Sequence, residues 1–178
     1  MAVFGNIGID SGNDTTLNVI TGRLYGLLLY GGLTCSQSGT VTALYIKTGT
    51  LTTANNLRLA LYEAAGNSLI ADTGSIAATS DAIVGGSVAP VAVTAGLAYY
   101  MAVQFDGSVS AMPAVNGHDL AFGSQAYGAF PGSNPSFGTY DTTKWMLSWA
   151  EGAAGGGGAG VSANLTSQTL MSMNRGFR

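Results

Sequence analysis

The sequence predicts an all-β protein, an antiparallel β-sandwich or jelly roll of about eight strands with extended N- and C-terminal arms. Two observations carry this prediction. Short segments in the middle of the chain alternate between apolar and small or polar residues, which is the two-residue period of a strand, and Gly, Asn, Asp and Ser separate them. No segment of useful length has the apolar spacing of an amphipathic helix. The chain has 178 residues, 47% of them hydrophobic, so a single domain can bury a sizeable core.

The expected strands follow one another with short turns between them. The first expected strand, at residues 23–30, is apolar on both faces, which predicts a central strand covered on both sides. In the expected strand at residues 56–62, one face is formed by Leu57, Leu59 and Leu61. In the last, Trp145 and Trp149 share a face with Leu147, and we expect both tryptophans in the core. In chain order the expected strands are residues 23–30, 41–47, 56–62, 68–72, 75–78, 87–93, 97–105 and 144–150.

Two segments fall outside this pattern and define the expected organisation. Residues 1–22 are rich in Gly, Asn and Thr and are expected to form an N-terminal arm. Residues 151–178 begin with a glycine run and end in a polar tail, which predicts a Gly-rich C-terminal arm. Residues 23–150 between them form the expected sandwich.

Charge is scarce, and this excludes several classes of partner. Charged residues make up 8% of the chain, against about 25% in an ordinary globular protein. Six Lys and Arg residues and a net charge of −3 give no basic patch for nucleic acid. Residues 82–105 carry no charge and would suit a spanning helix in length, but Pro90 and clean alternation after Gly96 indicate strands. The N-terminal residues have no basic region and no apolar stretch, so we expect neither a signal peptide nor a membrane partner.

Residues suited to catalysis are few. His118 is the only histidine and stands beside Asp119, but neighbouring residues on an extended chain point apart, and no Gly-x-Ser-x-Gly nucleophile motif occurs. Cys35 has no basic neighbour in sequence to lower its pKa, so we interpret it as inert. It is the only cysteine, which is consistent with synthesis in a reducing cytosol. The spacing Gly155-x-Gly157-x-x-Gly160 matches a dinucleotide fingerprint but lacks the helix and the acidic residue that such a site needs. We expect no enzyme activity and no cofactor.

A metal site has one weak candidate. Asp10 and Asp14 stand close together in Asp-Ser-Gly-Asn-Asp, and carboxylate and amide oxygens suit calcium. The complete calcium-loop pattern is absent, and a turn stabilised by Asp or Asn side chains explains the same residues. We therefore expect no metal.

An aromatic stretch is the strongest candidate for a binding surface. Between residues 122 and 149, aromatic residues alternate with Gly, Ser, Asn and Pro. Aromatic faces stack on the apolar faces of sugars, while Asp and Asn bind the hydroxyls. The same residues also suit a subunit interface or a loop that closes the fold. The candidate glycan or interface contacts are Tyr127, Phe130, Phe137, Tyr140 and Asp141.

Residues 22–106 resemble a β-sandwich module that recurs in tailed-phage virion proteins of the capsid decoration or fibre type. The likeness rests on Gly-Thr-Val-Thr-Ala-Leu-Tyr-Ile at 39–46, Leu-Arg-Leu-Ala-Leu-Tyr-Glu at 57–63, Leu-Ile-Ala-Asp-Thr-Gly at 69–74 and Val-Thr-Ala-Gly-Leu-Ala-Tyr-Tyr-Met-Ala-Val at 93–103. It covers about half of the chain and is a pattern of strands and turns. Modules of this shape also occur in bacterial surface and sugar-binding proteins.

The resemblance implies a phage structural protein made in the host cytoplasm and placed on the virion surface. We expect a decoration (cement) protein that forms a homo-oligomer, with a trimer favoured, and that binds the major capsid protein or other virion subunits. The alternative is a host-recognition tail-fibre or carbohydrate-binding module that binds a host glycan through residues 127–149.

Overall fold

The protein is all-β in the part of the chain that the computed structural model describes, which is residues 2–5, 15–19, 23–28, 35, 37–63, 68–116, 120–133, 139–141, 144–146 and 148–155. Those residues form strands and turns and contain no helix, and therefore none that is long and apolar enough to cross a membrane. The strands are β1 (Ala2–Gly5), β2 (Thr15–Val19), β3 (Arg23–Leu28), β4 (Gly39–Lys47), β5 (Thr50–Leu51), β6 (Asn56–Glu63), β7 (Ser68–Asp72), β8 (Ile76–Ala77), β9 (Ile83–Val93), β10 (Tyr99–Phe105), β11 (Val109–Asn116), β12 (Leu120–Ser124), β13 (Thr139–Asp141), β14 (Lys144–Met146) and β15 (Ser148–Ala154).

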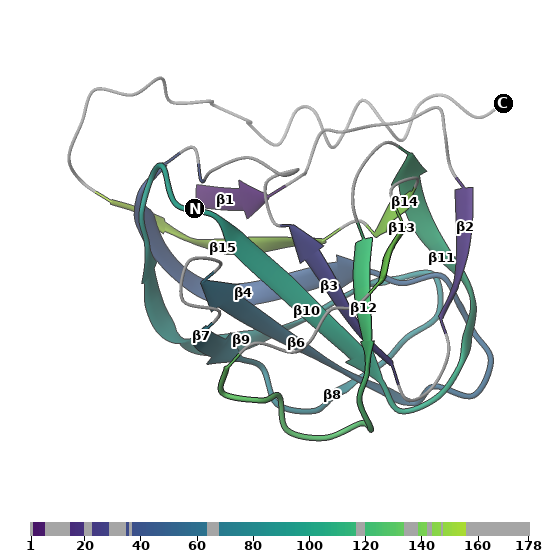
Figure 1. Ribbon diagram of the computed structural model, residues 1–178. Helices are drawn as coiled ribbons and strands as arrows, with labels where there is room; N and C mark the ends of the chain where they lie inside the picture. Colours follow the sequence, from purple (N-terminus) through teal and green to yellow (C-terminus); the bar gives the residue numbers. More distant parts are fainter. Residues whose placement is uncertain are drawn as a thin grey trace, which may run out of the picture.

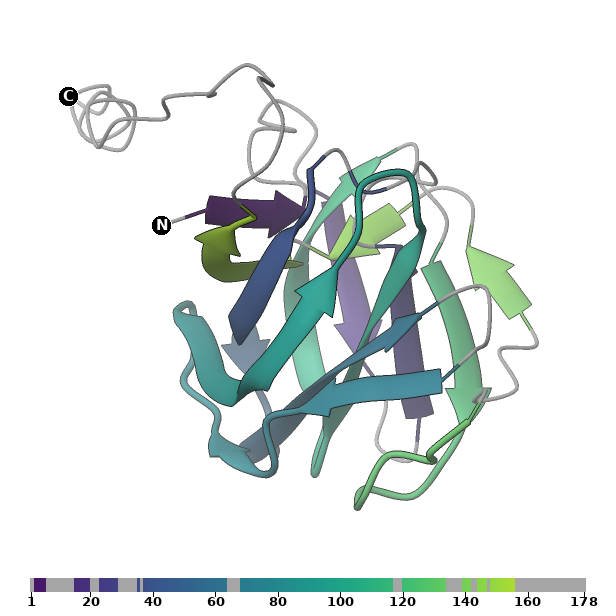
Figure 2. The same cartoon turned by 90° about the vertical axis from the view of Figure 1, so that its left-hand side faces the viewer.

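The strands form three antiparallel sheets. The first sheet has the order β1-β15-β4-β9, and the second has the order β13-β12-β3-β10-β6-β7, with β8 also paired to β6. The third sheet has the order β14-β11-β2, with β5 also paired to β11. Strands from the two ends of the chain meet in the first sheet, where β1 pairs with β15 (Figure 1 and Figure 2). Most pairings therefore join segments that are distant in sequence.

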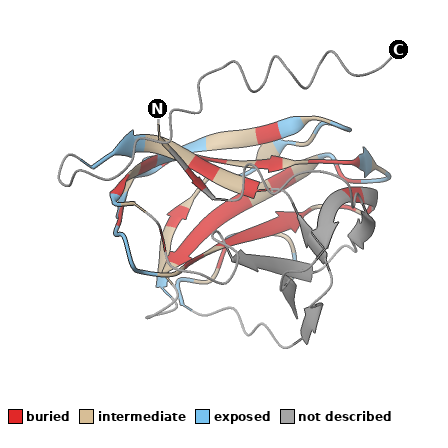
Figure 3. Cartoon of the chain, turned by 90° about the horizontal axis from the view of Figure 1, so that it is seen from above, coloured by how far each residue is buried: buried red, intermediate tan, exposed pale blue. Residues whose placement is uncertain are grey.

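One large cluster of buried apolar side chains includes residues of all three sheets, and most of its members come from the first and second sheets. The first sheet contributes Phe4, Leu44 and Ile46 to it, all fully buried. Figure 3 shows exposed residues at the periphery of the described part and buried residues along the strands inside it. From the second sheet come the buried side chains Leu57, Leu59, Leu61, Ala71, Tyr99, Met101, Val103 and Phe105.

A β-bulge in β4 decides which of its residues face the core. Val41 pairs with Gly152 on one side and Val91 on the other, and the next paired residue is Ala43, so Thr42 is left without a partner in either ladder. One extra residue reverses the inward and outward alternation of the strand. Val41 is therefore buried together with Leu44 and Ile46, which strict alternation would place on the opposite face. Tyr45 is turned outward as a result.

Strand periodicity located most of the strands. The expected central strand at residues 23–30 corresponds to β3, which lies between β12 and β10. The expected strands at residues 41–47, 56–62, 68–72, 75–78, 87–93 and 97–105 correspond to β4 and β6 to β10. The uncharged stretch at residues 82–105 forms β9 and β10 rather than a helix. Residues 1–22 contain β1 and β2, and β15 extends to Ala154, beyond the expected end of the sandwich at residue 150.

The expected strand at residues 144–150 is wrong in two respects. It is divided into β14, which pairs with β11 in the third sheet, and β15, which pairs with β1 and β4 in the first sheet. Trp149 is only half-buried, whereas its neighbours Ser148 and Ala150 are buried. Because adjacent residues of a strand point to opposite faces, Trp149 lies on the outer face of the first sheet and not in the core.

Candidate functional site

The outer face of the first sheet carries two half-buried aromatic residues side by side. Trp149 of β15 pairs directly with Tyr45 of β4, and their rings are stacked with centroids 5.6 Å apart and planes 18° from parallel. We call Tyr45 and Trp149 the aromatic pair. Residues that are directly opposite on neighbouring strands have their side chains on the same face, so the pair follows from the register of β15 on β4.

Glycines stand at both ends of this cross-strand row. Gly5 of β1 pairs with Trp149, and Gly85 of β9 pairs with Tyr45. A Cβ atom at Gly85 would stand 2.1 Å from Cδ1 of Tyr45, so only glycine leaves room for the tyrosine ring in its present place. The sequence thus provides two large rings in the middle of a row whose outer positions have no side chain.

Polar groups flank the aromatic pair on the same face. The indole Nε1–H of Trp149 donates a hydrogen bond to Oε1 of Glu151, at 3.1 Å, which fixes the orientation of both side chains. The ammonium group of Lys47, two residues from Tyr45 on β4, donates to the backbone oxygen of Asp81 at 2.6 Å. Glu151 pairs with Ala43 on β4, and Ala43 pairs with Ser87 on β9. This face therefore combines aromatic rings, a carboxylate, an ammonium group and a hydroxyl.

The outer face of the second sheet is covered by residues 125–133, which we call the covering loop. Phe130 is 5% exposed and packs on Ala60, Tyr62 and Ala102. Its ring also lies 5.8 Å from the Arg58 guanidinium carbon. The hydroxyl of Tyr62, which packs against Phe130, donates a hydrogen bond to the backbone oxygen of Pro131 at 2.7 Å. The covering loop thus buries the outer face of the second sheet over β6 and β10.

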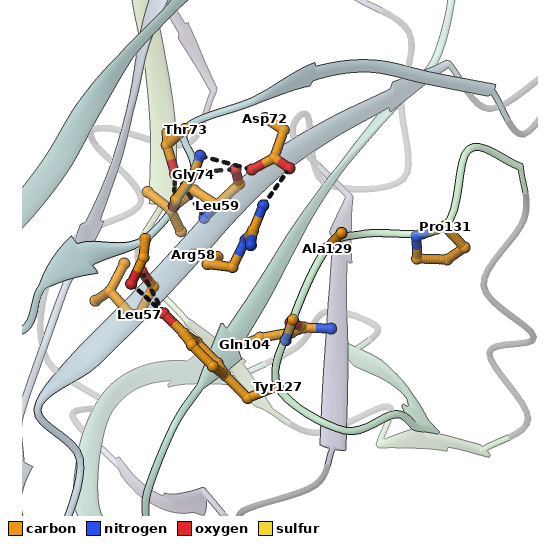
Figure 4. Close-up of polar contacts among 12 residues, drawn as sticks. Leu57, Arg58, Leu59, Asp72, Thr73, Gly74, Gln104, Tyr127, Ala129 and Pro131 are labelled. Carbon is orange, nitrogen blue, oxygen red and sulfur yellow. Dashed lines mark hydrogen bonds and ion pairs between the residues drawn. The ribbon is translucent and has the colours of Figure 1, made fainter.

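Further hydrogen bonds hold the covering loop in place. The backbone N–H of Gly128 donates to the amide oxygen of the fully buried Gln104 at 3.2 Å. The hydroxyl of Tyr127 lies 2.6 Å from that of Ser75 and donates to the backbone oxygen of Leu57 at 3.4 Å. Figure 4 shows Tyr127 reaching toward Leu57 from the loop. These contacts anchor the loop to β6, to β10 and to the segment between β7 and β8.

Two charged groups lie near the covering loop. Arg58 and Asp72 form an ion pair of 2.7 Å between β6 and β7, also visible in Figure 4. Burial, together with the smaller effect of the negative charge of Asp72, raises the pKa of Tyr62 to about 12. The phenol therefore stays protonated and remains a hydrogen-bond donor over the neutral range.

Four of the candidate contacts predicted from sequence lie in two segments of the described residues. Tyr127 and Phe130 belong to the covering loop, while Tyr140 and Asp141 belong to β13 and pair with Ala121 and Leu120. The remaining candidates, Phe137, Asp10, Asp14 and His118, lie outside the described residues.

Cys35 is buried, and its thiol donates to the backbone oxygen of Gln37 at 2.9 Å. Within the described ranges no group of three or more His, Cys, Asp or Glu residues is arranged to hold a metal ion.

The exposed surface of the described residues is short-chained and almost uncharged. Among the residues whose exposure the structure describes, the exposed positions are occupied mainly by Ser, Thr, Ala and Gly, and Asp81 is the only charged residue at such a position. The large apolar residues at these positions are Ile83, at 61% exposure, and Leu97, at 38%. The charged side chains that the structure shows as half-buried are Lys47, Arg58, Glu63, Asp72, Asp106 and Glu151.

Tyr45 was missed as a site residue, and Trp149 was assigned to the core. The alternation of residues 43–47 does place Tyr45 on the face of the strand away from Leu44 and Ile46, which is a signal that Tyr45 points outward. The pairing of Tyr45 with Trp149 depends on long-range register, which local sequence does not encode.

Comparison of the chain with models of protein families, with curated proteins and with solved structures finds no match.

Proposed function

We propose that the first and second sheets form a β-sandwich of jelly-roll type, and that this sandwich is a structural subunit of a tailed-phage particle. Support for the sandwich comes from the core that the two inner faces share. Support for the role in a particle comes from the resemblance of residues 22–106 to phage modules and, above all, from the scarcity of charge at the exposed positions that the structure describes.

The uncharged surface is the observation that carries the proposal. A soluble monomer commonly has about 25–35% charged residues on its surface. Among the residues whose exposure the structure describes, Asp81 is the only charged one at an exposed position. Charged groups are expensive to bury and are depleted in interface cores. Short Ser, Thr and Ala side chains also lose little rotamer freedom when a partner covers them. Such a surface suits a protein whose working state is an assembly.

In this proposal the chain acts as a decoration (cement) protein. It is made in the host cytoplasm, forms a homo-oligomer, with a trimer favoured, and binds the major capsid protein or other subunits at the virion surface. Burial of backbone and short side chains between neighbouring subunits holds the particle together. Because assembly binds only the folded chain, the stability of the chain rises with assembly by mass action.

Charge insertion tests the proposal. Lysine is placed singly at four exposed positions on different parts of the surface: Thr50, Ala89, Ala129 and Ala153. Substitutions at exposed sites change stability by only about 0.5 kcal/mol or less, so each variant should fold like the parent. A lysine inside an interface must be desolvated, and we expect at least one variant to lose assembly by about tenfold or more.

The measurements are light scattering of the full chain over a range of concentrations and co-sedimentation with tailed-phage capsids that lack it. The matched controls carry serine at the same four positions, which changes side-chain size but adds no charge. A parent chain that stays monomeric and does not sediment with capsids contradicts the proposal, as does assembly that tolerates lysine at all four positions.

A further inference from the structure

We propose that the aromatic pair on the outer face of the first sheet is a saccharide-binding site for β-linked, gluco-configured sugar chains. This inference goes beyond assembly and does not depend on it, since it concerns one small face of the sheet. Of residues 127–149, which the sequence offers for a host glycan, this site uses Trp149 alone, because the covering loop packs on the other sheet.

The rings are arranged for stacking. Both residues are half-buried, and their rings are stacked on each other with planes 18° from parallel, so a ligand would contact the ring surfaces that the partner ring does not cover. The hydrogen bond from Trp149 to Glu151 and the seat of Tyr45 against Gly85 fix the rings before any ligand arrives. Fixed side chains on strands lose little conformational freedom on binding, which favours affinity for a weakly held ligand.

The chemistry of a gluco-configured pyranose matches this arrangement. All its ring substituents are equatorial, so each face presents only axial C–H groups, which are apolar and slightly positive. Such a face is attracted to the negative face of an aromatic ring. Glycine at both ends of the row, Gly5 and Gly85, leaves no side chain to block a sugar chain that extends beyond the pair.

The flanking polar groups match the equatorial hydroxyls. The carboxylate of Glu151 accepts one hydrogen bond from the indole and retains further acceptor capacity. The ammonium group of Lys47 has three donors, of which one contacts the backbone oxygen of Asp81. Ser87 supplies a hydroxyl in the adjacent row. Together they offer acceptors and donors beside an apolar stacking surface, which is the composition of a ligand site.

A protein partner fits this face less well. An interface core here would have to bury Lys47 and Glu151, and charged residues are depleted in such cores. Elsewhere the described surface offers broad areas without charge. A hydroxyl-rich ligand instead hydrogen-bonds the charged groups and leaves them in contact with water.

The test is titration of the full chain with cellohexaose and, separately, with chitohexaose. Binding is monitored by tryptophan fluorescence and by the NMR signal of the Trp149 indole N–H. We expect binding in the micromolar to millimolar range typical of exposed, preformed sites. Mannohexaose, whose axial hydroxyl disrupts one ring face, should bind more weakly. Trp145→Phe removes the only other tryptophan and should leave both the affinity and the fluorescence response in place.

Variants of the pair decide whether the site is the proposed one. Trp149→Ala and Tyr45→Ala should each weaken binding by about tenfold or more, since each removes a stacking surface. Tyr45→Phe keeps the ring and should retain affinity within about twofold, a difference below the energy of one hydrogen bond. Circular dichroism checks that each variant is folded, and the indole N–H shift in the parent chain locates the ligand if a variant unfolds.

Three outcomes would overturn the proposal. The first is the absence of binding to either hexasaccharide by the parent chain. The second is binding that survives both alanine substitutions in folded protein, or that leaves the Trp149 indole signal unmoved. The third is a change in oligomeric mass, without a change in sugar binding, on substitution of Tyr45 or Trp149, which would identify the pair as a contact between copies of the chain.

Discussion

Asp106 is expected to be a major local determinant of stability, because its carboxylate joins the start of β6 to the end of β10. Oδ1 accepts hydrogen bonds from the backbone N–H groups of Asn55 and Asn56, at 2.8 and 2.9 Å. Oδ2 accepts a third from the side-chain amide of Asn56, at 2.7 Å. The adjacent Gly107 lets the two segments approach closely, since a Cβ there would stand 2.4 Å from the backbone carbon of Thr53.

Asp106→Ala removes all three hydrogen bonds. A hydrogen bond to a charged group contributes about 1.5–3 kcal/mol where it is shielded from water, and less where water replaces it. Asn55 is exposed and Asn56 is half-buried, so water compensates for part of the loss. We expect the free energy of unfolding to fall by about 2–3 kcal/mol. Asp106→Asn keeps one acceptor oxygen and should lose about 1 kcal/mol.

The same contacts predict a pH dependence. Burial raises the pKa of Asp106, but the hydrogen bonds from Asn56 and Asn55 outweigh it, and the pKa lies below its ordinary value of 3.8. A carboxyl whose pKa is lower in the folded state stabilises the fold above its unfolded pKa, and this stabilisation is lost as the pH falls through the folded pKa. The difference between the parent chain and Asp106→Asn should therefore be full at pH 7 and shrink below about pH 4.

The assay is urea unfolding followed by circular dichroism and by tryptophan fluorescence, at pH 7 and at several values down to pH 3. Asn55→Ala is the matched control, because the backbone N–H of residue 55 still reaches Asp106 and only a 3.3 Å side-chain contact to Thr53 is lost. The reasoning is refuted if Asp106→Ala unfolds within about 0.5 kcal/mol of the parent chain, which is the scatter of ordinary surface substitutions. A difference from Asp106→Asn that does not change with pH would refute the electrostatic part.

Two further predictions concern the covering loop and the close approach of strands. Because the pKa of Tyr62 is raised to about 12, the free energy of unfolding should fall by about 2–3 kcal/mol as the pH rises from about 10 to 12, and urea unfolding of Tyr62→Phe should show a smaller fall over that window. An equal fall in the two proteins would contradict this. Gly152→Ala should cost about 1–3 kcal/mol, because the new Cβ would stand 1.8 Å from the backbone oxygen of Thr40 and no rotamer relieves that contact. Gly132→Ala, which meets nothing within 4 Å, is its control, and equal thermal midpoints for the two variants would count against the prediction.

The sequence predicted strands best where one face is apolar over a full strand. Leu57, Leu59 and Leu61 alternate without interruption, and β6 lies where expected. Strands β11 and β12 were not predicted, because Pro113 interrupts one and Gly123 the other, and both residues weaken a strand pattern. Tertiary pairing overrides these local signals: Pro113 pairs with Thr16, and Gly123 with Leu24.

The candidate site was less predictable than the fold. The sequence pointed to the aromatic stretch at residues 122–149, and Trp149 from that stretch does contribute to the aromatic pair. Its partner Tyr45 lies far away in the chain, and neither residue is distinguished by a motif. Phe130, from the same stretch, is instead a buried anchor of the covering loop. Composition identifies aromatic residues, but only packing decides which of them are covered.

The sequence by itself determined the all-β class, most strand positions and the scarcity of charge, because side-chain alternation and composition are local properties. The tertiary structure decided the orientation and pairing of the residues on the outer face. The unpaired Thr42 shifts the phase of β4, the register of β15 sets Trp149 beside Tyr45, and Gly85 leaves space for the tyrosine ring. Each of these features depends on a neighbouring strand from a distant part of the chain, and for that reason only the folded chain determines them.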